Sequence, residues 1–132
     1  MVACAGDYYD VAAKTLVVDV NTNTQTELSV SASNMDVCNG NIYLYCTTYD
    51  ENWNTSATFY RVDASTLAAT PILQDYSSTL SSAYGINVNP ATGDIYICNS
   101  VYGSNADVFV FNSNGEKLRQ LEAGVYANKV VF

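Results

Sequence analysis

The sequence predicts an all-β fold in which groups of short strands recur along the chain. Residues 40–44, Gly-Asn-Ile-Tyr-Leu, return 53 residues later as Gly-Asp-Ile-Tyr-Ile at residues 93–97. After each copy and a polar loop comes a second apolar run, first at residues 59–63 and then at residues 108–112. A period near 50 residues made of short strands is typical of stacked all-β units. We therefore predict a β-propeller of about three four-stranded blades, in one domain over residues 1–132.

The composition favours strands and turns. Hydrophobic residues make up 48% of the chain, which is enough for a core, and charged residues make up only 14%. Tyrosine occurs 11 times, and aromatic and β-branched residues are enriched in strands. A length of 132 residues suits a single domain.

The first unit, residues 1–30, is expected to be an incomplete blade. We expect strands at residues 1–7, 15–20 and 25–30, with a polar turn at 21–24 between the last two. Three strands are one fewer than a full blade contains. The missing strand is expected to be the innermost.

The second unit, residues 34–75, is expected to be a complete blade. Asn39-Gly40 is the strongest hairpin signal of the chain, because a type I′ turn needs positive φ at both central residues. The expected strands cover residues 35–38, 41–46, 57–62 and 67–74.

The third unit, residues 83–122, repeats this plan. A longer turn at residues 89–93 carries Pro90, and a turn at 112–115 places Gly115 where a left-handed residue is wanted. The expected strands cover residues 85–88, 94–99, 107–111 and 117–122.

The tail, residues 126–132, is expected to supply one further strand at 128–132 that completes a blade. The total is then twelve strands, which is enough for three blades of four. The first blade lacks one strand, however, and the tail has one strand in excess. Three blades are too few for a ring of about four to eight. Two solutions stay open: two chains form a six-bladed ring by self-association, or the chain is part of a longer propeller.

Charge and cysteine usage exclude several classes of function. The net charge is −8 and the five basic residues are scattered, which argues against binding to nucleic acid or anionic membranes. No apolar run reaches the length of about 20 residues that crosses a bilayer. The chain has no His and no CxxC pair, so we expect no cofactor, no metal site and no activated cysteine. Small buried thiols are the expected role of the four cysteines, and their spacing leaves a disulfide open.

Two segments carry a resemblance to a known family. Residues 96–99, Tyr-Ile-Cys-Asn, followed by residues 108–112, resemble the bacterial propeller repeat named for its Tyr-Val-Thr-Asn strand. Residues 43–46 are similar in a more degenerate form. Residues 83–96 and 124–132 resemble surface and lipoprotein propellers of Bacteroidetes, a group without an assigned function.

The resemblance implies an extracytoplasmic location, in the periplasm or at the cell surface, and a binding or scaffold role. It supplies no catalytic residues. It is closest over residues 83–132 and weakest before residue 31. Members of the group are usually long and carry an exported leader, so the chain is similar to a C-terminal fragment or to a short relative.

Aromatic residues are the candidate ligand-binding residues. In a propeller, the loops between second and third strands share one face with the segments between blades, and that face would collect several rings. The candidates are Tyr49, Trp53, Tyr84, Tyr102 and Tyr126, with Tyr76 nearby. Ring faces beside Asn and Asp suit a glycan or a peptide. Packing of the same rings against neighbouring loops is the alternative.

The acidic residues have weaker functional interpretations. Asp50 and Glu51 crowd one loop, where they could hold Ca²⁺, serve a carbohydrate hydrolase or lyase, or form a turn. Asp19, Asp63 and Asn112 each close the same kind of strand, which indicates a structural role in turns. We therefore expect a non-enzymatic binding or scaffold protein, with the carbohydrate enzyme as the alternative.

Overall fold

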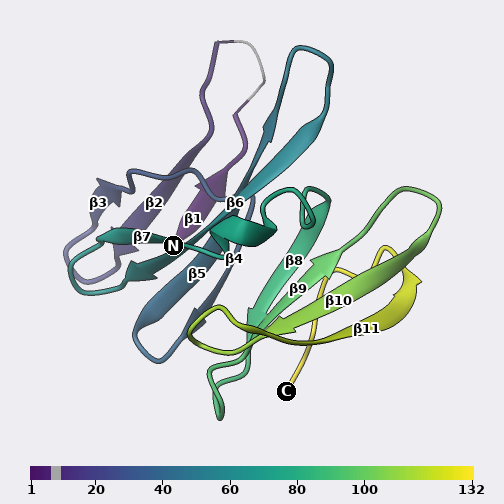
Figure 1. The fold of residues 1–132 in the computed structure, drawn as a ribbon. Helices are drawn as coiled ribbons and strands as arrows, with labels where there is room; N and C mark the ends of the chain where they lie inside the picture. The colour runs from purple at the N-terminus through teal and green to yellow at the C-terminus, as the bar shows by residue number, and fades with distance from the viewer. Residues whose placement is uncertain (7–9) are drawn as a thin grey trace.

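The computed structural model describes residues 1–6 and 10–132 and shows an all-β protein, as predicted (Figure 1). The described residues contain eleven strands and one short 3₁₀ helix, η1 (Gln74–Tyr76). The strands form three open antiparallel sheets of three, four and four strands. None of the described helices is long and apolar enough to cross a bilayer.

Sheet 1 contains β1 (Val2–Cys4), β2 (Lys14–Asp19) and β3 (Thr24–Glu27), in that order. The predicted strands at 15–20 and 25–30 are confirmed, with boundaries shifted toward the N-terminus. Part of the strand predicted at 1–7 is present as β1, and residue 7 lies outside the described residues. The turn between β2 and β3 is closed by Asp19, whose Oδ1 accepts the N–H of Asn21 at 2.8 Å.

Sheet 2 is a meander of four strands, each paired with the next in the chain. The type I′ turn is confirmed, because Asn39 has φ 48° and Gly40 has φ 73°. The two central strands are longer than predicted, which shortens the loop between them to residues 50–54. The strands are β4 (Asn34–Cys38), β5 (Asn41–Tyr49), β6 (Thr55–Asp63) and β7 (Ala69–Ile72).

Sheet 3 repeats the meander. Gly93 and Gly115 close its first and last turns with φ values of 77° and 85°, and the left-handed position predicted for Gly115 is confirmed. The last strand runs three residues beyond its predicted end. The strands are β8 (Ala83–Val88), β9 (Ile95–Asn99), β10 (Asn105–Phe111) and β11 (Lys117–Val125).

The sheets pack face to face, with sheet 2 in the middle. Because side chains alternate along a strand, β5 sends Ile42 and Leu44 to one side and Tyr43 and Tyr45 to the other. The first pair joins a cluster with Leu28, which follows β3, and the second pair joins a cluster that includes residues of sheet 3. Apolar contacts between sheets therefore form the core.

The outer face of sheet 3 is covered by the tail. Tyr96, Cys98, Val108 and Val110 form a third apolar cluster there, and Val130 packs against it. The predicted strand at 128–132 is not formed within this chain, since β11 ends at Val125 and no strand follows. The tail is held mainly by side-chain hydrogen bonds and apolar contacts in place of a ladder. Completion of a blade by the tail stays a prediction.

Candidate functional site

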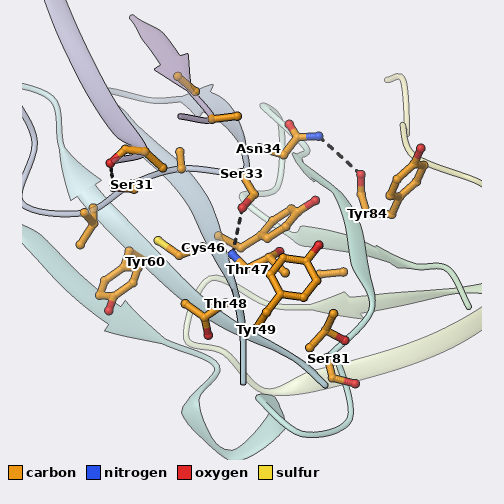
Figure 2. Close-up of a pocket in the computed structure, with 18 of the residues that line it drawn as sticks. Ser31, Ser33, Asn34, Cys46, Thr47, Thr48, Tyr49, Tyr60, Ser81 and Tyr84 are labelled. Carbon is orange, nitrogen blue, oxygen red and sulfur yellow. Dashed lines mark hydrogen bonds between the residues drawn. The ribbon is translucent and has the colours of Figure 1, made fainter. Parts of the chain in front are cut away.

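A cavity of about 1330 Å³ opens at the end of the sheets where several connections converge (Figure 2). Its walls come from residues 29–34, which join β3 to β4, from residues 45–49 at the end of β5, and from residues 81–84 at the start of β8. Residues of β1 and the tail also reach it. The cavity thus gathers segments from all three sheets.

Hydroxyl groups dominate the lining of the cavity. Of the 25 described residues that line it, 13 are Ser, Thr or Tyr, and one, Asp10, is charged. Asn34 and Asn128 add two amides. Such a surface offers many neutral hydrogen-bond donors and acceptors, so it suits an uncharged polar ligand better than an ion.

Hydrogen bonds between elements fix the segment 31–33 in the cavity wall. Thr15 of β2 is fully buried, and its Oγ1 accepts the N–H of Ala32 at 2.7 Å. The Ser31 hydroxyl donates to the carbonyl oxygen of Ala13 at 2.7 Å. The Ser33 Oγ accepts the N–H of Thr47 at 2.9 Å, as Figure 2 shows. The wall is therefore tied to both β2 and β5.

The side chains of Tyr45 and Cys46, which line the cavity, are neutral at physiological pH. Burial raises the pKa of Tyr45 to about 12. Burial likewise raises the pKa of the Cys46 thiol, so this cavity residue lacks the thiolate that a nucleophile needs. All four cysteines are free thiols, and two of them, Cys38 and Cys98, are buried as expected.

The five predicted binding residues fall into two aromatic groups. Tyr49 and Trp53 form an edge-on pair with ring centroids 6.0 Å apart. Tyr126 lies 6.3 Å from Tyr84 and 6.1 Å from Tyr102, so these three rings form a chain. All five side chains are exposed, Tyr102 the most at 88%.

The two aromatic groups flank the cavity. Tyr49, the last residue of β5, and Tyr84 of β8 both line it. Figure 2 shows these two residues at the cavity, with Tyr84 on the side of Asn34. Tyr76 behaves differently: its ring packs edge-on against buried Phe111 at 4.9 Å, which gives it a structural role.

The acidic loop is built as a turn. The Asp50 carboxylate accepts hydrogen bonds from the side chain and the backbone N–H of Asn54 and from the N–H of Asn52, all at 2.8 Å. These bonds, the Asn54 side chain first, hold the pKa of Asp50 below its usual value. The described residues contain no group of three or more His, Cys, Asp or Glu side chains that could bind a metal ion.

The predicted turn role of the recurring Asx residues is confirmed. Asp63 accepts bonds from the backbone N–H groups of Ser65 and Thr66, and Asn112 accepts the N–H of Asn114. Asp19 does the same in sheet 1. All three lie at or just beyond the end of the strand that precedes the outermost strand of their sheet.

The hydroxyl lining was not predicted from the sequence. A signal for it exists in the alternation Ser29, Ser31 and Ser33, which places small hydroxyls at every second position before β4. Tyr60 was also missed, because its place in the middle of β6 suggests core packing. Its ring is half-buried and borders the cavity (Figure 2).

Comparison of the chain with protein-family models finds no match, and comparison with curated proteins finds none. The function must therefore be inferred from the cavity and from the two aromatic groups beside it.

Proposed function

We propose that the protein is a non-enzymatic binding module that holds a neutral glycan in the hydroxyl-lined cavity between its sheets. The observation that carries the proposal is the combination of a large cavity, one charged side chain among the described lining residues, and exposed rings at its rim. Sugar rings stack on aromatic faces and exchange hydrogen bonds with hydroxyls and amides. A net charge of −8 disfavours acidic sugars.

The architecture of the binding module is proposed to be that of a β-propeller, with the sheets as consecutive blades. Each sheet is an antiparallel meander, and neighbouring sheets pack face to face through apolar residues. The resemblance to the Tyr-Val-Thr-Asn repeat supports the same arrangement. It also motivates the proposed location outside the cytoplasm, in the periplasm or at the cell surface of a bacterium.

A carbohydrate hydrolase or lyase acting through loop carboxylates has less support. Such an enzyme needs a carboxylic acid with a raised pKa to protonate the leaving group. Asp50 has a lowered pKa, and three hydrogen bonds from its own loop occupy its carboxylate. We therefore place Asp50 in the structure of the loop.

The proposal is tested by screening neutral oligosaccharides for binding and measuring the best ligand by calorimetry. Replacing Tyr84 or Tyr49 with Ala removes a ring at the cavity and is expected to weaken binding by about tenfold. Val37→Ala is the matched control, because Val37 is 61% exposed on β4 and does not line the cavity.

Three results would contradict the proposal. The first is that no oligosaccharide in the screen binds to the protein. Equal loss of affinity in the Val37→Ala control would show that the tyrosines are not specific contacts. Binding of extended peptides alone, at the same tyrosines, would replace the glycan by a peptide ligand.

A further inference from the structure

The tail, residues 126–132, follows β8 at very short distance (Figure 1). A Cβ atom on Gly85 would collide with the carbonyl oxygen of Asn128, so only glycine permits this approach. The Ser100 hydroxyl donates to the carbonyl oxygen of Ala127 at 2.8 Å. These contacts hold the tail against β8, an edge strand of sheet 3, on the outer face of that sheet.

One hydrogen bond recurs between successive units. In sheet 2, Oδ2 of Asp36 on β4 accepts the N–H of Val88 on β8 at 2.8 Å. In sheet 3, Oδ1 of Asn87 on β8 accepts the N–H of Val130 at 2.8 Å. The two acceptors are equivalent, because Asp36 pairs with Tyr43 and Asn87 with Tyr96, the matching tyrosines of the repeat.

The tail is therefore bound to β8 as β8 is bound to β4. It occupies the place that the first strand of a following sheet would take. None of the described strands pairs with it. Val131 is 82% exposed, and Phe132, whose ring packs edge-on against Tyr96 at 5.0 Å, is still 54% exposed.

The three described strands of sheet 1 do not include the one that the tail could supply. The turn closed by Asp19 matches the turns closed by Asp63 and Asn112, which makes β2 the equivalent of β6 and β10. By this alignment β1 is equivalent to β5 and β9, and none of the described strands of sheet 1 corresponds to β4 and β8. Among the described residues, β1 pairs with β2 alone, and Val2 on it is 49% exposed.

We propose that two copies of the chain associate by pairing the tail of each with the open edge of β1 in the other. Each copy then receives the fourth strand of sheet 1 and donates its own tail, so the contact obeys two-fold symmetry. The pairing covers an exposed strand edge and exposed apolar residues together. It does not depend on the glycan proposal.

Disulfide trapping tests the pairing directly. Cys4 lies on β1 as a free thiol, so a cysteine at Lys129 or Val131 of the tail would approach Cys4 of the second copy. Under mild oxidation, Lys129→Cys or Val131→Cys is expected to give a disulfide-linked dimer of twice the 14.3 kDa chain mass. A reducing agent should convert this dimer back to the monomer. Adding Cys4→Ser should abolish it, and Val20→Cys, 87% exposed in a turn, should not form it.

The native mass gives the second measurement. Light scattering on the unmodified chain is expected to show a dimer. Because neighbouring N–H groups of an extended strand point to opposite sides, Val131→Pro removes the N–H on the side away from β8 and should give a folded monomer. Val131→Ala keeps the N–H and should remain a dimer.

The proposal is overturned by a monomeric unmodified chain, by a disulfide formed within one chain, or by a dimer that neither tail cysteine cross-links through Cys4. Circular dichroism of every variant confirms that the strands are retained, so that loss of folding is not mistaken for loss of association.

Discussion

Sheets 1 and 3 are both antiparallel meanders and differ in how much of them is buried. Sheet 3 has four strands, and apolar residues of β9 and β10 are covered on both faces; Ile97, Val110 and Phe111 have no exposed surface. Sheet 1 has three strands, and Thr15 is its one fully buried residue among those described. The free energy of folding is thus concentrated in sheets 2 and 3, while sheet 1 offers an open edge and one wall of the cavity.

The largest expected effect is on the core between sheets 2 and 3. Phe111→Ala removes a fully buried ring that Tyr76 contacts, and should destabilise the protein by about 3–5 kcal/mol in urea unfolding. Leu16→Ala on β2 is the comparison, since Leu16 is only half-buried in sheet 1. An equal loss for both variants would contradict the difference between the sheets.

A smaller effect is expected at the polar anchor of sheet 1. Thr15→Val keeps the shape of the side chain and leaves the N–H of Ala32 without its acceptor, which should cost about 1–3 kcal/mol. Because Ala32 lies in the cavity wall, the amide of Ala32 should also exchange faster with deuterium. Thr26→Val on the exposed strand β3 is the matched control and should change neither quantity.

Gly85→Ala tests how tightly the tail is fixed to sheet 3. The new methyl group meets the backbone of Asn128, so the tail must move, at an expected cost of about 1–3 kcal/mol. Hydrogen exchange at the amide of Val130 should accelerate, because its bond to Asn87 is lost. Gly124→Ala is the control, since nothing lies near a Cβ at that position. Unchanged exchange at Val130 would show that the contact with Gly85 does not hold the tail.

The smallest expected effect concerns the repeated turns. The Ser65 hydroxyl, followed by the N–H groups of Thr66 and Ser65, lowers the pKa of Asp63 in the folded protein to about 2 from 3.8. A lowered pKa stabilises the fold above the unfolded value, and this contribution is lost as the pH falls from near 4 through about 2. Asp63→Asn should flatten the pH dependence of the unfolding midpoint in this window. An unchanged slope would show that the turn does not contribute.

Local sequence signals were sufficient for most of the fold. Asn39-Gly40, Gly93 and Gly115 marked turns whose backbone requires positive φ, and the alternation along residues 41–46 set which side chains enter which core. The tail could not be placed in this way. Val130, Val131 and Phe132 have the composition of a strand, but whether they pair depends on an edge far away in the sequence.

The candidate site was predicted only in part. The five aromatic residues were predicted because one face of a propeller would collect its loops; all five are exposed and two of them line the cavity, whereas Tyr76 packs against Phe111. The cavity itself arises where segments 29–34, 45–49 and 81–84 meet, and no local pattern encodes that meeting. Serine and threonine are also common in ordinary loops, so their presence alone indicated no site.

The alternation along β5 has a consequence for mutation by insertion. Ile42 and Leu44 face sheet 1, and Tyr43 and Tyr45 face sheet 3. A shift of one residue along β5 would therefore exchange aliphatic and aromatic side chains at both interfaces simultaneously. Both interfaces would then be mispacked, and neither could offset the loss of packing at the other. Length changes in this strand should therefore be tolerated only in steps of two residues, whereas the loop at residues 50–54 imposes no such parity.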